Sequence, residues 1–427
     1  MKKNLLISLA IFLPAQVYAA SPAGLNEPIT GAHQRGVSMP ASPANSETDE
    51  PASDLTLRQA LALTLKFNPE LSAYSHERSA SEASLLQAGA MPNPVLDLTG
   101  ENLSNNRLRA DGDRTTTIQI GQLIELGGKR AARIKLAETG RELANWDYEA
   151  KRIDVLSRVS QTFIDVVAGQ QGQALAMELL RLAQQVADAV GKRVLAGKVS
   201  PIEETKARIA LSAAQIELDQ AKRQLAAARK RLAALWGNTN PRFQNAAGDL
   251  EKFASTPAYE QLAERVRNNP DLARWTTEIA RRKAVMETEK AKAVPDITLS
   301  AGMRRFSQFD DRAYLLGISI PIPVFDRNRG GILEASRRLD KTMDEQRAAE
   351  NRLITELAQS FSRLSAIRNE IDTLRSAILP GARSAYDGAT KGYQLGKFGF
   401  LDVLDAQRTL FQARSQYLKA LADYTAG

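Results

Sequence analysis

Two stretches of the chain match each other at a fixed distance along the sequence. Residues 194–211 read VLAGKVSPIEETKARIAL, and residues 393–410 read YQLGKFGFLDVLDAQRTL. The matched pairs, each separated by 199 residues, are Gly197 and Gly396, Lys198 and Lys397, Glu203 and Asp402, and Leu211 and Leu410. A repeat over such a distance indicates one structural unit built twice. The 427 residues are therefore predicted to form two copies of one extended unit rather than two or three ordinary domains.

Each matched stretch is predicted to be a turn between two long helices. Gly197 in the first copy, and Gly396 and Gly399 in the second, can adopt the backbone angles that a helix end needs. After each turn, apolar residues recur in alternating steps of three and four, and large side chains mostly alternate with small ones. The two stripes are Leu211, Ala214, Leu218, Ala221, Leu225, Ala228, Leu232 and Leu235, and Val403, Ala406, Leu410, Ala413, Tyr417, Ala420 and Tyr424. This heptad spacing predicts coiled-coil packing, with an ordinary amphipathic helix in a bundle as the alternative.

The N-terminus has the pattern of an export signal. Lys2 and Lys3 precede an apolar run, 5–13, and small or tolerated residues then lead to Ala19. The run is too short to span a bilayer, so residues 1–19 are predicted to be a secretory signal peptide rather than an uncleaved anchor helix. Residues 20–53 are rich in Pro, Ala, Ser and Gly without periodicity, which predicts a disordered or extended arm.

Composition excludes several kinds of site. The chain has no cysteine, so a disulfide, a thiolate metal site, a cysteine nucleophile and a lipid-bearing cysteine are impossible. With only two histidines, His33 and His76, a site of imidazole ligands is not expected. A net charge of +8 from 57 basic and 49 acidic residues fits solvated helix faces better than a nucleic-acid surface. No phosphate-binding loop, catalytic triad or metal-ligand spacing occurs, so the chain is predicted to be no enzyme and to need no cofactor or resident metal.

Each copy also contains a predicted β-hairpin. The first copy is placed at 54–236 and the second at 258–427, with residues 237–257 as the linker. Period-two alternation predicts strands at about 94–102 and 115–123 in the first copy, and at about 296–304 and 314–322 in the second. Each strand is apolar on one side only and has a length that suits a tilted strand crossing an outer membrane.

Four strands alone cannot close into a barrel. Open strand edges in lipid would leave backbone groups unpaired, which a bilayer does not permit. Two possibilities follow: the hairpins lie in a soluble sheet, or several chains share one barrel. Three chains would supply twelve strands, an allowed even number.

A long helical segment is predicted after each hairpin. The first runs to about Ala196 and the second to about Leu395, with Pro380 as the internal proline. At 1.5 Å per residue, some 65 to 70 residues would reach about 100 Å. Because these segments are too charged to span a membrane, their length indicates a coiled coil or a repeat scaffold.

Four segments carry a resemblance to a known family. They read LTLRQALALTLKFNPEL (55–71), QLIELGGKRAAR (122–133), ISIPIPVFDRNRGGI (318–332) and YQLGKFGFLDVLDAQR (393–408). They resemble the TolC-like outer-membrane efflux proteins, in particular the subgroup for heavy-metal efflux of the cobalt–zinc–cadmium type.

The resemblance implies a fold, a location and partners. The fold would be mainly α with a small β part, in two tandem helix–hairpin–helix repeats. It would form a homotrimer with a twelve-stranded barrel in the outer membrane of a Gram-negative cell and a long α-helical barrel in the periplasm. A periplasmic adaptor (membrane fusion protein) would join it to an inner-membrane pump of the resistance–nodulation–division type. Some relatives carry a lipid on an N-terminal cysteine, which this chain lacks.

The resemblance places a periplasmic gate on the DVLD motif. The implied gate residues are Asp402, Asp405, Glu203 and Tyr393, with Tyr393 as a tether of the closed state. In a trimer, Asp402 and Asp405 would supply six carboxylates at one constriction, which would attract cations and repel anions. Lys206 stands where the second acid of the first copy would be, so the gate is weighted toward the second copy. The alternative is that Asp402 only complements a helix dipole.

The two turns are the predicted docking surface for the adaptor. These tip residues are Gly197, Lys198, Val199, Ser200, Pro201, Gly396, Lys397, Phe398 and Gly399. Exposed apolar residues such as Val199 and Phe398 at the end of a charged rod indicate a partner. The alternative is that Phe398 packs into its own helix pair.

The predicted function is a passive exit duct for heavy-metal cations, driven by its pump partner. A duct need not bind its cargo tightly, which fits the lack of a recognisable site. Two alternatives stay open: a TolC-like duct for drugs or secreted proteins, and a periplasmic coiled-coil adaptor or tether with soluble hairpins. The sequence does not select the metal or the partner proteins.

Overall fold

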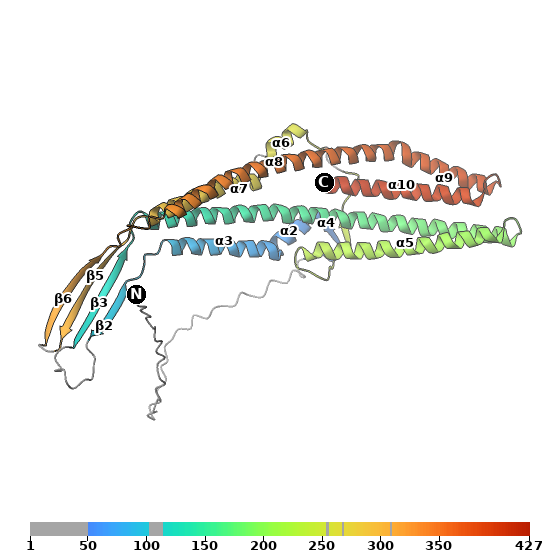
Figure 1. The fold of residues 1–427 in the computed structure, drawn as a ribbon. Helices are drawn as coiled ribbons and strands as arrows, with labels where there is room; N and C mark the ends of the chain where they lie inside the picture. Colours follow the sequence, from blue (N-terminus) through green and yellow to red (C-terminus); the bar gives the residue numbers. More distant parts are fainter. Residues whose placement is uncertain (1–49, 102–113, 253–255, 267–268, 308–309) are drawn as a thin grey trace, which may run out of the picture. The chain divides into compact units, whose positions relative to one another are not determined.

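The computed structural model describes residues 50–101, 114–252, 256–266, 269–307 and 310–427. This part of the chain is mainly helical with one four-stranded sheet (Figure 1). The predicted signal peptide, residues 1–19, lies outside the described residues. So do most of the predicted N-terminal arm and the loop between the first two predicted strands.

The elements follow the order helix, hairpin, long helix and return helix twice along the chain (Figure 1). The helices are α2 (Leu57–Phe67), α3 (Pro69–Ala88), α4 (Lys129–Leu195), α5 (Pro201–Ala234), α6 (Tyr259–Val266), α7 (Pro270–Lys292), α8 (Arg329–Thr373), α9 (Leu379–Gln394) and α10 (Phe400–Ala426), with a π-helical turn, η2 (Leu374–Ile378). The strands are β1 (Asp54–Thr56), β2 (Val95–Glu101), β3 (Thr115–Ile124), β4 (Asn245–Ala247), β5 (Ile297–Phe306) and β6 (Asp311–Ser319).

The same local chemistry starts α3 and α7. Asn68 and Asn269 are the N-cap residues, and their side-chain oxygens accept hydrogen bonds from the backbone N–H of Leu71 and Asp271, each at 2.9 Å. A proline fills the first position of each helix, where no N–H is required. The Asn-Pro pairs therefore mark a break in each copy and the start of the next helix.

Helix α4 is the element against which most of the others pack. Its 67 residues correspond to about 100 Å at 1.5 Å per residue. It contacts α3 and α7 in the half near the sheet, and α5 and α10 in the other half (Figure 1). Among the described residues, no helix combines the length and apolar character needed to cross a membrane.

The main hydrophobic core surrounds the middle of α4. Val159, Phe163 and Trp236 are among its buried members, together with residues of α2, α5 and α10. A buried carboxylate, that of Glu50, ties the N-terminal strand segment to this core. It accepts hydrogen bonds from the side chains of Trp236 and Asn238 and from the backbone N–H of the residues at 242 and 243. This full set of donors offsets the cost of burying the charge.

The four-stranded sheet joins the two hairpins. Its order is β2-β3-β5-β6, and each neighbouring pair is antiparallel. The central pair, β3 and β5, brings together strands from the two copies, with Thr115 opposite Phe306 and Ile124 opposite Ile297. Strands β2 and β6 are the two edges, and within the described residues neither has a partner on its outer side.

The second long helical segment differs from the first. The sequence predicted one continuous segment up to about Leu395, but the structure divides it into α8, the π-helical turn η2 and α9. Pro380 follows η2 and cannot donate a backbone hydrogen bond, so regular α-helical bonding cannot run through this point. Helix α4 has no internal proline and stays unbroken.

Candidate functional site

One face of the four-stranded sheet is a continuous apolar surface. Residues directly opposite each other on neighbouring strands point to the same side. The apolar rows across the sheet are Leu98, Ile118, Met303 and Tyr314; Leu96, Ile120, Ala301 and Leu316; and Leu299 with Ile318, a row that the polar Gln122 begins on β3. These side chains lack cover in the single chain, since Tyr314 is 85% exposed and Leu316 is 90% exposed.

The opposite face of the sheet is polar. Asp97, Thr99 and Thr117 lie on it, together with Arg304 and Glu101. The Arg304 guanidinium donates to the Thr117 hydroxyl at 3.0 Å and lies 3.9 Å from the Glu101 carboxylate. A sheet with one bare apolar face and one hydrogen-bonded polar face is suited to separate lipid from water.

The predicted tips are two closely similar turns at the far ends of the long helices. Gly197 and Gly396 have φ angles of 67° and 74°, the left-handed conformation that a glycine adopts without strain. In the first turn the N–H of Lys198 donates to the carbonyl of Arg193 at 2.9 Å. In the second, the N–H of Lys397 donates to the carbonyl of Gly392 at 2.8 Å. Both patterns are Schellman caps, so both helices end in the same way.

Two predicted gate residues from different copies are in contact. The Tyr393 hydroxyl donates to the Glu203 carboxylate at 3.3 Å. The Arg193 guanidinium lies 4.3 Å from the centre of the Tyr393 ring and donates to the Tyr393 carbonyl at 3.0 Å. Burial, partly offset by the Arg193 cation, raises the pKa of Tyr393. These contacts tie the α9 end of the second copy to the tip of the first.

Arg193 was missed by the sequence analysis, although a signal for it exists. Its counterpart in the second copy is Gly392, so the two copies differ by a cation at this position. The packing of Phe398 also requires a glycine at position 392, because a Cβ added at Gly392 would lie 2.1 Å from the Phe398 ring. Phe398 therefore packs over Gly392 within its own turn and remains 53% exposed.

Asp402 and Asp405 occupy the start of α10. The Asp402 carboxylate accepts a hydrogen bond from the backbone N–H of Gly399 at 2.8 Å, so it caps the helix as the alternative interpretation expected. Asp405 lies one turn further on and is exposed. In the part of the chain that the structure describes, no ion pair or hydrogen bond engages the Asp405 carboxylate.

A cavity that the sequence did not predict lies beside these residues. Its volume is about 480 Å³, and it is lined by α4, α9, α10 and Lys198 of the first tip. Tyr386, Tyr393 and Phe400 give it aromatic walls, and Arg193 contributes a cation. Its residues come from both copies, so only the folded arrangement brings them together.

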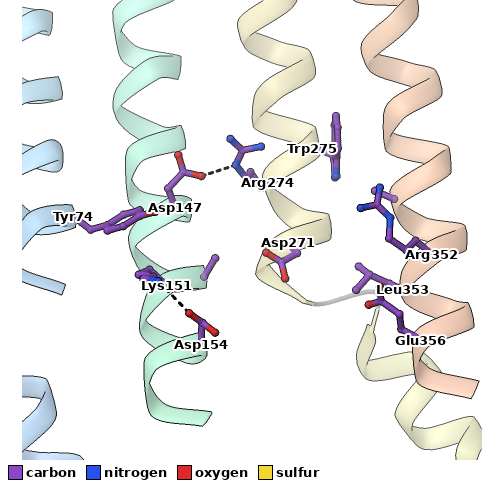
Figure 2. A pocket seen from close by; sticks show the side chains of 12 residues that line it. Tyr74, Asp147, Lys151, Asp154, Asp271, Arg274, Trp275, Arg352, Leu353 and Glu356 are labelled. Atoms are coloured by element: carbon purple, nitrogen blue, oxygen red, sulfur yellow. Dashed lines mark hydrogen bonds and ion pairs between the residues drawn. The ribbon is translucent and has the colours of Figure 1, made fainter. Parts of the chain in front are cut away.

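A second cavity lies in the half of α4 near the sheet. Figure 2 shows side chains from α3, α4, α7 and α8 around a groove of about 660 Å³. Two ion pairs line it, with Arg274 2.6 Å from Asp147 and Lys151 3.2 Å from Asp154 (Figure 2). Within the described ranges, no group of three or more histidine, aspartate and glutamate side chains is placed to hold a metal ion.

Glu70 fastens α3 to α4 next to this groove. Its carboxylate lies 2.6 Å from the Lys151 ammonium and 2.7 Å from the Arg158 guanidinium. Hydrogen bonds from Arg158 and then Lys151 lower the pKa of Glu70 to about 2. This pair of bonds crosses between helices, unlike most ion pairs of the surface, which join neighbouring turns of one helix.

A sheet with one bare apolar face, at one end of long charged helices, is typical of the class of proteins that place strands in a membrane. Comparisons with known proteins identify the class further. The sequence profile of the outer membrane efflux protein family matches residues 60–238 and 262–426. The chain belongs to the outer membrane efflux protein family.

Relatives and solved structures agree with this assignment. The chain is 41% identical to the cobalt-zinc-cadmium resistance protein CzcC of Cupriavidus metallidurans, covering 87% of this chain and 88% of that protein. It is 27% identical to the nickel-cobalt-cadmium resistance protein NccC of Alcaligenes xylosoxydans xylosoxydans, covering 73% of this chain and 71% of that protein.

The fold matches that of solved membrane channels. The structure of CusC aligns with a TM-score of 0.73 at 18% identity, over 87% of this chain and 90% of that one. The outer membrane protein VceC of Vibrio cholerae aligns with a TM-score of 0.72 at 19% identity, over 86% of this chain and 93% of that one. At this identity the likeness concerns the fold alone.

The Glu70 contacts lead to a pH-dependent prediction. A carboxylate with a lowered pKa in the folded chain contributes stability above its unfolded pKa of 4.5, and this contribution is lost as the pH falls toward 2. Glu70→Gln should therefore lower stability at pH 7 by up to about 1 kcal/mol, the range of a partly exposed ion pair. Urea unfolding between pH 7 and pH 2.5 should show the difference from wild type shrinking below pH 4.5. Glu77→Gln, an exposed position on the same helix, is the matched control; a difference that persists unchanged at the lowest pH contradicts the assignment.

Proposed function

We propose that the chain is the outer-membrane exit duct of a tripartite efflux system of the resistance–nodulation–division type, with heavy-metal cations as its cargo. The observation that carries this proposal is the sheet, which is apolar on one face and open at both edges. The sheet needs lipid for its face and further strands for its edges. A channel shared by several chains supplies both.

Three chains would complete the barrel. Strands β2 and β6 run antiparallel to each other, because the order β2-β3-β5-β6 alternates at every step. The β6 edge of one chain can therefore pair with the β2 edge of a neighbouring chain, and the strands still alternate in direction. Three copies give twelve strands, an even number as closed membrane barrels require.

The helices support the same assembly. Helix α8 has 45 residues, of which Ala335, Leu339, Thr342 and Ile371 are buried in the single chain. Helix α3 has two buried residues, Leu71 and Ala88. Both helices lie at outer edges of the helical layer, since α8 packs on α7 and α3 packs on α4. A neighbouring chain would cover these faces, and the chains together would close a periplasmic α-helical barrel.

The cargo is inferred from the relatives together with the gate residues. By their names, CzcC and NccC are resistance proteins for cobalt, cadmium and zinc or nickel. A threefold arrangement would place the carboxylates of Asp402 and Asp405 around one opening. Such a ring attracts cations and repels anions. The predicted signal peptide at residues 1–19 and the missing cysteine fit an exported, non-lipidated outer-membrane protein.

A duct for organic compounds is the second candidate. The chain is 27% identical to the pyoverdine export outer membrane protein OpmQ of Pseudomonas putida, over 68% of this chain and 63% of that protein. The metal assignment is preferred because the identity to CzcC is higher and covers more of both proteins. The adaptor or tether alternative loses its basis, since the efflux family profile covers both copies. Members of this family are channel proteins, and we infer no catalytic activity.

The tips are the proposed docking surface for the periplasmic adaptor that links the duct to its pump. They are the turns from Gly197 to Pro201 and from Gly396 to Gly399, and the second turn carries the half-exposed Phe398. Both turns are held in shape by their Schellman caps, so an adaptor would meet preformed surfaces. Matching caps in the two copies would offer six similar turns in a trimer.

The assembly is tested by the size and location of the mature protein. Membranes are fractionated, the protein is extracted in mild detergent, and the particle mass is measured. We expect a trimer in the outer-membrane fraction, because three copies cover the sheet edges. A monomer or dimer free in the periplasm contradicts the shared barrel.

The acidic opening is tested by ion selectivity. Asp402→Asn combined with Asp405→Asn should lower the cation-to-anion permeability ratio at least about twofold in planar bilayers, because the negative ring is removed. Asp387→Asn, an exposed acid on α9 paired with Arg383, is the control and should leave the ratio unchanged. Equal ratios for the wild type and the double variant would remove the gate assignment.

Docking at the tips is tested at Phe398. Phe398→Asp should reduce co-purification of the adaptor about tenfold or more, as expected for an apolar anchor of an interface, while the trimer stays intact. Phe398→Leu keeps an apolar side chain over Gly392 and should retain most of the binding. Adaptor capture by the aspartate variant at the wild-type level would rule out this surface.

A further inference from the structure

The apolar face of the sheet ends in a row of basic residues at the end of the strands farthest from the helices. The row that follows Leu98, Ile118, Met303 and Tyr314 consists of Gly100, Thr116, Arg305 and Arg312. Arg305 and Arg312 are directly opposite each other on β5 and β6, and both are exposed. Both side chains therefore project from the apolar face of the sheet.

Arg114 adds a third guanidinium to the same side. It precedes β3, and its carbonyl accepts a hydrogen bond from the Ser307 N–H at 2.9 Å, which continues the ladder by one step. Arg114 is two residues from Thr116 and so shares its face. We call these three arginines the basic row; they occupy the two successive levels of the sheet just beyond the last apolar row.

Few contacts within the chain use these charges. The Arg305 guanidinium lies 2.7 Å from the Asp310 carboxylate, in a pair whose side chains are 57% and 80% exposed. An ion pair this exposed contributes little to stability, so the Arg305 guanidinium can leave Asp310 and bind another anion. Among the described residues, the Arg312 guanidinium has no ion pair or side-chain hydrogen bond.

The spacing of the arginines along the strand fits the edge of a lipid layer. Arg305 lies eight residues beyond Ile297, where the apolar side of β5 begins, which is about 27 Å at 3.3–3.4 Å per residue. At the usual tilt of about 40°, this corresponds to a rise of about 20 Å, close to the apolar band of about 25 Å in membrane barrels. The long arginine side chains can span the remaining distance to the headgroups.

We propose that Arg114, Arg305 and Arg312 form a binding surface for the phosphate groups of anionic lipids in the outer leaflet. This inference rests on the proposed function, which places the sheet in the outer membrane with the helices on the periplasmic side. A guanidinium matches a phosphate through two parallel hydrogen bonds, which favours arginine over a simple point charge for this role. Three copies of the chain would surround the barrel with nine such groups and anchor its outer rim to lipid.

The polar face supplies a matched control. Arg304 is the neighbour of Arg305 on the same strand but points to the opposite side, where it contacts Thr117 and Glu101. Arg304→Gln removes the same charge from the same level of the sheet without touching the lipid side. A general effect of charge on the sheet would therefore also appear in Arg304→Gln, at about half the size seen in a variant that loses two such charges.

The test compares the protein in two kinds of lipid disc. Wild type, the double variant Arg305→Gln/Arg312→Gln and Arg304→Gln are reconstituted in discs of phosphatidylcholine and in discs of phosphatidylcholine mixed with phosphatidylglycerol. The readout is the temperature at which the trimer dissociates. We expect the anionic lipid to raise this temperature by a few degrees for wild type and for Arg304→Gln, because a ligand bound to the assembled state stabilises it. The double variant should lose most of the rise, and high salt should reduce the rise for wild type.

Each other outcome overturns the proposal. A loss in Arg304→Gln of about half that in the double variant, or more, would show a general charge effect. An equal rise in all three proteins would show that the basic row is not used. Inorganic phosphate added to the phosphatidylcholine discs should not reproduce the rise; if it does, the ligand is a free anion. Protein that enters the discs as a trimer but does not respond to anionic lipid overturns this inference alone. Failure to enter the discs overturns the proposed function and the inference together.

Discussion

Unpaired backbone groups along β2 and β6 constrain the whole molecule. A strand edge satisfies its N–H and C=O groups with water or with another strand, and lipid provides neither. The apolar rows on one face of the sheet leave no place for water on that side. With the sheet in the outer membrane, as we propose, the chain completes this hydrogen bonding only as part of a larger closed sheet, and the layer of helices then follows the same symmetry as the strands.

In the helical part, α4 is the helix against which elements of both internal repeats pack. Helix α4 is unbroken and carries partners from both copies, so contacts such as Arg274 with Asp147 and Arg193 with Tyr393 lie on one continuous element. The second long segment is interrupted at η2, beside the buried residues Ile371 and Leu374. The two internal repeats therefore have the same order of elements, but the long helix is unbroken in the first and interrupted in the second.

Much of this fold could be predicted from the sequence, because the features that determine it are local. The Asn-Pro pairs, the tip glycines and the change from helical to period-two spacing each act within a few residues, and the structure contains helices, strands and turns at these places. Contacts between distant residues could not be predicted in this way. The hydrogen bonds to Glu50 join residues nearly two hundred positions apart, and the packing of Phe398 on Gly392 depends on how one turn closes. The contact of Tyr393 with Glu203 has the same character, since the resemblance suggested both residues but only the folded chain pairs them.

The π-helical turn at Leu374–Ile378 also sets the angular phase of everything that follows it. A π turn carries one residue more than an α turn, and each residue of an α-helix rotates the chain by about 100°. Beyond η2, the side chains of α9 are therefore turned by that angle relative to an uninterrupted helix. The extra residue acts as a rotational offset between α8, which faces α7, and the terminal turns, where α9 faces α10. A single inserted residue in the middle of a helix thus decides which side of the chain Tyr393 presents at its end.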